Sequence, residues 1–408
     1  MQIIIPHYIY FQEKVSTNLA VAFNTHIEKI APFEELIELY PEAKVTTLKE
    51  HSLLMPGLIN AHVHIEFSAN KTQLSYGDFL NWLYSVIENR ENLIEGCNKE
   101  CMSKAIESML ESGITTFGAI SSHAMDLEAC ADAKQNVVFF NELIGSQATM
   151  ADVLFQDFQN RLKESQEVQR EGFIPAVAIH SPYSVHPVLI KKALEIVKEQ
   201  NLKLTAHFME SKAEREWLDS SSGDFKEFFE KLLKQGANVS DANEFLAHFE
   251  NQQTLLTHVV KANSEELKKI QEHQHTIIHC PISNRLLGNG AINLEELEIQ
   301  KIRWILATDG LSSNYKLDLF EEMKVALFMH SELPLLPLAQ KLLRSVTKDA
   351  AEALGVNAGE IAEGKNADML IVDLESEPTK ELALHLILHR YNISKVYVRG
   401  ELVKGEDK

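Results

Sequence analysis

The feature of this sequence that most constrains its fold is a short apolar run that recurs eight times, alternating with longer amphipathic stretches. The runs are LMPGLINAHVH, GITTFGAI, NVVFFNE, FIPAVAIH, LKLTAHF, TLLTHVV, HTIIHC and RWILATD. Segments between them, such as VLIKKALEIVKEQN, have apolar residues at helical spacing. Short continuous apolar runs are typical of strands buried on both faces. Eight of them alternating with helices predict an α/β fold, the (β/α)8 or TIM barrel.

The two ends of the chain break this alternation. The first 57 residues contain MQIIIPHYIYF and NLAVAFNTHIEKI, and the last 58 contain DMLIVDL and VYVRGELV, which are typical of short strands joined by turns. We therefore expect two units. Residues 58–350 form the barrel, and residues 1–57 and 351–408 together form a small β-sandwich domain.

The net charge of the chain limits its partners. Its 59 acidic and 39 basic side chains give a formal net charge of -20. A surface of that sign repels a phosphate backbone and anionic lipid, and the sequence contains no basic stripe, so we expect neither a nucleic-acid nor a membrane partner. The N-terminal MQIIIPHYIYFQEKV lacks the basic lead of a signal peptide and is interrupted by Pro6. These features predict a cytoplasmic protein.

Polar residues stand at the ends of most of the apolar runs, where a barrel has its catalytic face. They are His62 and His64 on the first run, His180 on the fourth, His207 on the fifth, His258 on the sixth, His279 on the seventh and Asp309 on the eighth. Residues two apart on a strand point to the same side, so His62 and His64 can bind one ion together. Several imidazoles and a carboxylate on one rim predict a site for a divalent cation.

The spacing His-x-His carries little weight alone. With 17 histidines in 408 residues, roughly 0.7 such pairs are expected by chance. A second pair, His273 and His275, follows a polar segment, and we interpret it as the solvated end of a helix. The metal hypothesis therefore depends on the whole set of run ends.

The segments MPGLINAHVH, HFME, LLTHVV and ATDG together resemble the metal-dependent amidohydrolase superfamily, in its mononuclear deaminase branch. The C-terminal IAEGKNADMLIVD and VYVRGELV resemble the β-sandwich appended to that superfamily, so the resemblance covers essentially the whole chain. It implies one divalent metal ion, with Zn²⁺ favoured over Fe²⁺ or Mn²⁺. The implied metal ligands are His62, His64, His207 and Asp309. The implied catalytic residues are Asp309, Glu210 as proton shuttle, and His258, which orients the attacking water.

Chemistry gives these residue types the same roles. A zinc-like ion with an open coordination position lowers the pKa of bound water from about 15.7 to about 7. Attack on an aromatic carbon that bears an amino group then requires one proton at the ring nitrogen and another on the departing ammonia. A carboxyl group beside the metal, such as that of Glu210, can deliver both after taking one from water. Binuclear relatives end the fourth strand in a modified lysine, and His180 at this place favours a single ion.

Further segments narrow the resemblance. HSPYSV at residues 180–185 resembles a motif of deaminases that act on adenosine-like thioethers, in which the histidine contacts substrate. FSANKTQLSYGDFLNWLYSVIENR, TFGAISS and HCPISNRLLGNG resemble more closely the aminodeoxyfutalosine deaminases of menaquinone biosynthesis. This implies hydrolysis of the 6-amino group of an adenine nucleoside that carries a 3-carboxybenzoyl group. The open alternatives are an adenosylhomocysteine or methylthioadenosine deaminase, a chlorohydrolase-type enzyme, and a non-catalytic metal-binding scaffold.

The candidate substrate-binding residues are His180, Trp82, Glu88, Arg90, Ser121 and Arg285. Trp82, with Glu88 or Arg90, is expected to contact the ribose or the base. The distal carboxylate of the substrate needs a local cation or clustered donors, because the net charge of the protein opposes it. We expect Arg285, on the loop after the seventh run, to bind it, with Arg90 and the pair Ser121 and Ser122 as alternatives. The sequence allows a homodimer without determining one.

Overall fold

The structure is a computed structural model that describes residues 1–69, 73–89, 96–389 and 391–406. Within these ranges its largest sheet has eight parallel strands in sequence order. They are β8 (Leu58–Val63), β9 (Ile114–Ser121), β10 (Asn136–Leu143), β11 (Phe173–Ile179), β12 (Leu204–Phe208), β13 (Leu255–His258), β14 (Thr276–His279) and β15 (Arg303–Leu306). The sheet closes where the Asp309 amide donates to the His62 carbonyl oxygen at 3.2 Å. The predicted TIM barrel is confirmed.

The barrel strands are buried on both faces, as their apolar composition requires. Every residue of β9 and β10 is buried. Along β10, Val138 and Phe140 join the cluster inside the barrel, whereas Val137 and Phe139 join the cluster under the helices. This alternation is the period of two of a β-strand.

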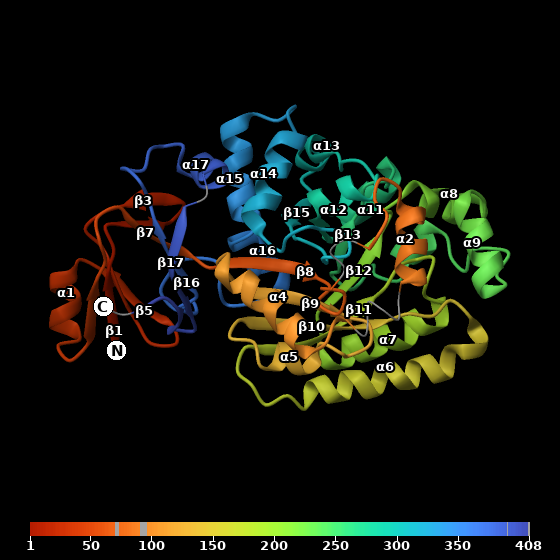
Figure 1. Ribbon diagram of the computed structural model, residues 1–408, viewed down its shortest axis with the longest axis horizontal. Coiled ribbons are helices and arrows are strands. Elements are labelled where there is room, and N and C mark those ends of the chain that lie inside the picture. The colour runs from red at the N-terminus through yellow and green to blue at the C-terminus, as the bar shows by residue number, and fades with distance from the viewer. Residues whose placement is uncertain (70–72, 90–95, 390, 407–408) are drawn as a thin grey trace.

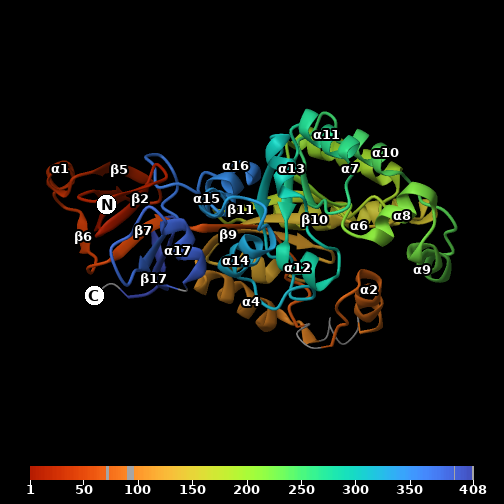
Figure 2. The same cartoon turned by 90° about the horizontal axis from the view of Figure 1, so that it is seen from above.

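Helices surround the barrel, as Figures 1 and 2 show. They are α2 (Phe79–Glu88), α4 (Lys99–Glu111), α5 (Leu127–Ala131), α6 (Ala151–Gln166), α7 (Pro187–Gln200), α8 (Lys212–Ser220), α9 (Asp224–Leu233), α10 (Ala242–Ala247), α11 (Ser264–Glu272), α12 (Pro281–Leu286), α13 (Leu294–Ile299), α14 (Leu319–Met329), α15 (Leu335–Ser345) and α16 (Lys348–Leu354), with a 3-10 turn at Ala148–Met150. Side-chain caps begin many of them, such as Asn263 on α11, whose side chain accepts from the Glu266 amide.

The ends of the chain form two further sheets, ordered β5-β4-β1-β6 and β18-β17-β16-β7-β2-β3. Their elements are β1 (Gln2–Ile5), β2 (Tyr8–Phe11), β3 (Lys14–Ser16), β4 (Ala20–Phe23), β5 (Ile27–Ala31), α1 (Phe33–Leu39), β6 (Lys44–Thr47), β7 (Ser52–Pro56), β16 (Met369–Asp373), α17 (Leu382–Leu388), β17 (Asn392–Val398) and β18 (Glu401–Lys404). β7 pairs with β16, so both termini build one sheet. Val21, Phe23, Leu54 and Tyr397 share one core between the sheets, which is the packing of a sandwich. Figure 1 shows this unit at one end of the barrel.

The division of the chain at residue 350 stays a prediction. α16 spans that position and adds Ala350, Ala351 and Leu354 to the cluster inside the barrel. α17, from the segment expected in the sandwich, contacts α14 and α15. The C-terminal segment therefore contributes to both units.

The interpretation of the His273–His275 pair as a solvated helix end is wrong for His275. His273 caps the C-terminus of α11 and is half-buried. His275 is 2% exposed, and its Nδ1 accepts from the Thr254 amide at 3.2 Å. The burial arises because β14 begins at the next residue, Thr276.

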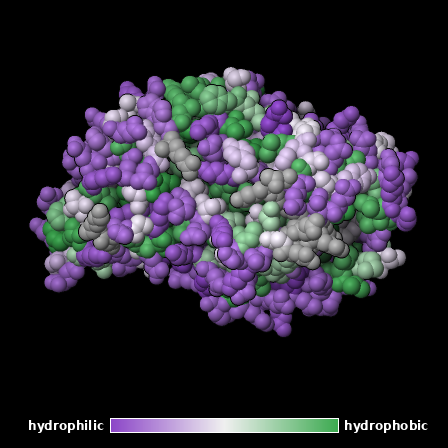
Figure 3. Space-filling view, viewed as in Figure 1, coloured by the Kyte–Doolittle hydropathy of each residue, from purple (hydrophilic) through white to green (hydrophobic). Residues whose placement is uncertain are grey.

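The surface is mostly hydrophilic on the face drawn in Figure 3. Hydrophobic side chains also reach it in patches, one of them over α14 and α15 at the top of the view. Phe328 and Leu335, from these two segments, are 71% and 52% exposed. In the described part of the chain, no helix is long and apolar enough to cross a membrane.

Candidate active site

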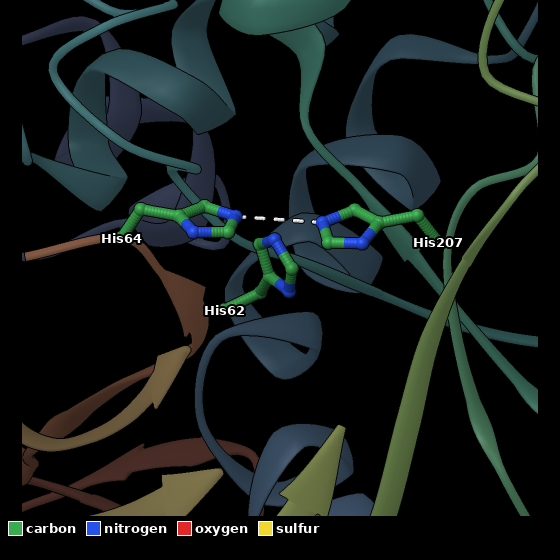
Figure 4. A group of neighbouring side chains, drawn as sticks. All are labelled: His62, His64 and His207. Carbon is green, nitrogen blue, oxygen red and sulfur yellow. Dashed lines mark hydrogen bonds between the residues drawn. The ribbon is translucent and has the colours of Figure 1, made fainter. Parts of the chain in front are cut away.

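The C-terminal ends of the barrel strands bring imidazoles and carboxylates together. His62 lies in β8 and His64 directly follows it, His207 lies in β12, and Asp309 follows β15. Figure 4 shows the three imidazoles, His62, His64 and His207, turned toward one another. Their candidate ligand atoms all lie within 4.8 Å of one another.

The spacing of these atoms suits a tetrahedral cation. His64 Nε2 is 3.4 Å from His207 Nε2, the pair joined by the dashed line in Figure 4. Asp309 Oδ1 is 3.7 Å from His62 Nε2 and 3.6 Å from His64 Nε2. With metal–nitrogen bonds of about 2.0–2.1 Å, the edges of a tetrahedron are about 3.3 Å long. The four residues therefore fit one divalent cation.

Hydrogen bonds turn the lone pairs of this cluster inward. His207 Nδ1 donates to the His180 carbonyl oxygen at 2.7 Å, so its Nε2 keeps a lone pair. Asp309 Oδ2 accepts from the Ser283 hydroxyl at 2.7 Å, which orients the carboxylate. His62 Nε2 is buried and, among the described residues, has no hydrogen-bond partner. Such a group costs on the order of 1–3 kcal/mol, which a bound cation would offset.

Burial sets the charge of the cluster. It lowers the pKa of His207 and of His180 to about 3, and it lowers the pKa of His62 well below the usual value. Burial opposes the ionisation of Asp309, but His64 and the other nearby imidazoles outweigh it and lower the pKa of that carboxyl. Neutral imidazoles and an ionised carboxylate are the forms that bind a cation.

Glu210 lies beside the cluster, shortly after β12. Its Oε1 is 3.6 Å from His258 Nε2 and accepts from Asn289 Nδ2 at 3.2 Å. Burial, and then the charge of Asp309, raise the pKa of Glu210 well above its usual value. The carboxyl group can therefore hold a proton closer to neutral pH than a solvated glutamate can.

The backbone is strained at two of these positions. His258 has a φ of 73° and Asp309 a φ of 57°, in the left-handed region that residues other than glycine rarely adopt. Such residues cost of order 1–3 kcal/mol each and cluster at functional sites.

Of the cluster, His64, His207 and Asp309 line a cavity of about 600 Å³. Much of the remaining lining is aromatic, including Phe67, Phe79, Trp82, Phe228 and Phe229. A cavity of this size with an apolar wall and a few convergent polar groups suits a small organic ligand.

Two of the predicted substrate-binding residues, His180 and Trp82, line this cavity. His180 Nδ1 lies 2.6 Å from the Ser184 hydroxyl, which fixes the ring. Trp82 Nε1 donates to the Ser312 carbonyl oxygen at 2.8 Å, which leaves the face of the indole as its contact surface.

Ser121 is buried but is not among the described residues that line the cavity. Its hydroxyl donates to Asp126 Oδ1 at 2.6 Å, so it supports the loop after β9. The next residue, Ser122, does line the cavity and donates to Glu142 Oε2 at 2.6 Å. Of the expected pair, Ser122 therefore faces the cavity and Ser121 does not, because neighbouring positions at a strand end point in opposite directions.

Arg285 and Glu88 are exposed and are also absent from the described lining. The prediction that Arg285 contacts the substrate is corrected accordingly. On α12, Ser283 and Asn284 are buried toward the site, and a turn of about 100° per residue carries Arg285 away from it. Glu88, the last residue of α2, is likewise turned away from the cavity, because the neighbouring Val86 and Ile87 face it. Arg90 lies outside the described residues.

Sequence reasoning missed several polar residues of the cavity, among them Glu142 and Arg161. Glu142, on β10, is 1% exposed, and its Oε1 has no hydrogen-bond partner among the described residues. Arg161, on α6, donates to the Glu142 carbonyl oxygen at 2.9 Å and is the only arginine or lysine in the described lining. The end of the run NVVFFNE could have indicated Glu142, whereas no local pattern marks an arginine within a helix.

A closed parallel barrel with imidazoles and carboxylates at the C-terminal ends of its strands defines a metal-dependent hydrolase of the TIM-barrel class. Residues 53–403 match the model of the Amidohydrolase family, and the chain belongs to that family.

Individual relatives are similar over nearly the whole chain. An aminodeoxyfutalosine deaminase of a Nitratiruptor species is 48% identical over 403 residues, which cover 98% of this chain and 99% of that protein. An adenosine deaminase of Helicobacter pylori is 34% identical over 396 residues, with 96% of each covered. The crystal structure of Helicobacter pylori aminofutalosine deaminase in complex with methylthio-coformycin has a TM-score of 0.93 at 33% identity and covers 99% of this chain and 100% of that one. The resemblance drawn from the sequence motifs is confirmed.

Proposed function

We propose that this chain is a metal-dependent deaminase that hydrolyses the 6-amino group of an adenine nucleoside, 6-amino-6-deoxyfutalosine of menaquinone biosynthesis. The observation that carries the proposal is the convergence of three imidazoles and Asp309 on one ligand position, with Glu210 beside it in the cavity. The 48% identity with the Nitratiruptor aminodeoxyfutalosine deaminase supports the choice of substrate.

In this proposal His62, His64, His207 and Asp309 hold one divalent cation, with zinc expected and iron or manganese able to replace it. When bound, the cation would lower the pKa of a coordinated water and so supply hydroxide at neutral pH. A second group of candidate ligands contains Glu142, His180 and His207. This second group is less available to a cation, because one of its nitrogen atoms, His207 Nδ1, already donates a hydrogen bond to the His180 carbonyl oxygen. One ion per chain follows.

Glu210 transfers the protons of the reaction. Deamination consumes one water and releases ammonia, so one proton of the attacking water moves to the ring nitrogen, and the second moves from the new hydroxyl group to the departing amino group. A buried carboxyl group beside the cluster can take each of these protons and deliver it in turn. His258, whose Nε2 is 3.6 Å from Glu210 Oε1, forms a hydrogen bond with the same water and orients it.

The rest of the cavity holds the nucleoside. Trp82 and the neighbouring phenylalanines offer ring faces to the base and to a benzoyl group. Glu142 Oε1 and His180 are assigned to the ribose hydroxyls, since Glu142 Oε1 is buried without a partner in the described part of the chain. Arg161 takes the place of Arg285 as the partner of the distal carboxylate.

The second candidate is a methylthioadenosine or adenosylhomocysteine deaminase. It is favoured by one observation, that the similar Helicobacter pylori aminofutalosine deaminase was crystallised with methylthio-coformycin. The two candidates share the chemistry at the adenine ring and differ in what occupies the distal part of the cavity.

Ammonia release from aminodeoxyfutalosine, methylthioadenosine, adenosylhomocysteine and adenosine, measured side by side on the metal-loaded protein, tests the proposal. We expect the highest kcat/KM for aminodeoxyfutalosine, with the Glu210→Gln protein as background. A strong preference for methylthioadenosine would reject the substrate while keeping the deaminase chemistry. Failure to release ammonia from all four would reject the function.

A homodimer in the cytoplasm completes the proposed assignment. Light scattering of the purified protein measures the subunit number, and fractionation of cells measures the location.

A further inference from the structure

A chain of hydrogen bonds leads from His258 to the protein surface. His258 Nδ1 lies 3.0 Å from Asn284 Oδ1, and Asn284 Nδ2 lies 3.4 Å from His279 Nδ1. His279 Nε2 lies 3.1 Å from His330 Nε2, and His330 Nδ1 lies 3.3 Å from Glu332 Oε1. We call these five residues the histidine chain.

All members of the histidine chain except the last are shielded from water. His258, Asn284, His279 and His330 are at most 1% exposed, whereas the Glu332 side chain is 43% exposed. The buried members come from β13, α12, β14 and the C-cap of α14. Buried polar groups are costly unless each is paired, so the continuity of the chain stabilises this side of the site.

The carboxylate of Glu332 determines the direction of every hydrogen bond in the chain. An ionised carboxylate only accepts, so His330 carries its proton on Nδ1, and its Nε2 accepts from His279 Nε2. His279 Nδ1 then accepts from the Asn284 amide nitrogen, and Asn284 Oδ1 accepts from His258 Nδ1. The opposite direction would leave Glu332 without a donor. A neutral His258 therefore presents an unprotonated Nε2 to the cavity.

We propose that the histidine chain is a positioning device through which the surface residue Glu332 fixes the tautomer of His258. The inference rests on the proposed function, in which His258 orients the attacking water. With the proton held on Nδ1, His258 Nε2 accepts one hydrogen bond from the water, and the other water proton is left for Glu210, whose Oε1 is 3.6 Å away. The opposite tautomer would donate to the water and turn its protons away from Nε2.

His330→Phe and Glu332→Leu each interrupt the histidine chain while His258 itself is not substituted. We expect kcat for deamination to fall about fivefold in each, which corresponds to roughly one net hydrogen bond, with KM and metal content unchanged. The melting temperature should stay unchanged in Glu332→Leu and fall in His330→Phe, which leaves the buried His279 Nε2 without its partner. Glu332→Gln keeps an acceptor oxygen and should stay within about twofold of the native kcat. Glu321→Leu is the matched control, because this carboxylate of α14 contacts Lys324 instead of the chain.

Nitrogen-15 spectra of the histidine-labelled, zinc-loaded protein read the tautomer without substrate. We expect the His258 signals, assigned by their loss in His258→Asn, to show a protonated Nδ1 and an unprotonated Nε2, and His330→Phe to populate the other tautomer. A native His258 protonated on Nε2, or an unchanged tautomer in both His330→Phe and Glu332→Leu, would overturn the proposal. An equal fall of kcat in Glu321→Leu, or a fall accompanied by metal loss, would also overturn it. Since no substrate is needed, this outcome is separable from failure of the proposed function.

Discussion

Glu210 must both take and give a proton, and burial raises the pKa of its carboxyl group. The turn that carries it is itself held in place, because the amides of Met209 and Glu210 donate to the Glu214 carboxylate at 3.0 and 2.7 Å. The position of the acid is therefore fixed by the backbone, and its side chain is free to act on the substrate.

Glu210→Gln should keep the metal and the fold but lose at least about 10²-fold in kcat, the lower end of what a positioned acid or base supplies. The amide matches the carboxyl in size and cannot accept the proton. Steady-state kinetics with elemental analysis of the same sample check this. Glu216→Gln is the control, because this carboxylate of α8 contacts Lys212 outside the cavity. A Glu210→Gln protein that turns over at nearly the native rate would show that Glu210 does not transfer the protons.

The second residue prediction distinguishes the two arginines. Arg161→Met should reduce kcat/KM for aminodeoxyfutalosine by a factor that corresponds to about 1.5–3 kcal/mol, the contribution of a hydrogen bond to a charged group. The kcat/KM for methylthioadenosine, which lacks the carboxylate, should barely change. Arg285→Met should leave kcat/KM for both substrates unchanged, because the Arg285 side chain is exposed outside the cavity. If kcat/KM falls equally for both substrates in Arg161→Met, then Arg161 does not bind the carboxylate, and its hydrogen bond to the Glu142 carbonyl oxygen has a structural role.

At the scale of the elements, the strands could be predicted from the sequence, but which side chains of each helix face the cavity could not. An apolar run in a parallel barrel ends where its strand ends, so His62, His207 and His258 could be placed from the sequence alone. Arg285 and Glu88 lie on helices, where an error of one residue turns a side chain about 100°. Arg161 reaches the cavity from α6 through a tertiary contact that has no local sequence signal.

His275, the residue directly before β14, supplies a prediction about pH. Burial, and then the charges of His273 and Arg303, lower the pKa of His275 to about 4. A folded-state pKa below the unfolded value of about 6.5 means that the unfolded chain takes the proton first, so stability is full above about pH 6.5 and is lost as the pH falls toward 4. The loss from this group is about 3 kcal/mol.

His275→Asn keeps an acceptor for the Thr254 amide and removes the titrating ring. The free energy of unfolding, measured in urea between pH 7 and about 4, should therefore fall less steeply in the variant. His385→Asn, on α17, is the control: it removes a histidine that is not among the groups that shift the pKa of His275, and it should follow the native curve. Parallel curves for native protein and His275→Asn would show that His275 does not contribute.

On the scale of the whole molecule, the two ends of the chain close on each other beside the barrel. β7 from the N-terminal segment pairs with β16, and β8 begins two residues after β7 ends. The strand that carries His62 thus starts directly from the sandwich. This arrangement follows from the apolar pattern of both ends, whereas the exact division does not, because α16 and α17 pack on the barrel.

The metal content of the protein tests the central claim most directly. Elemental analysis of the native protein should find about one divalent ion per chain, and His62→Ala or His207→Ala should lose it while circular dichroism shows a retained fold. His273→Ala, outside the cluster, should keep the ion. Two stoichiometric ions in the native protein, or an unchanged content in His62→Ala and His207→Ala, would contradict the account.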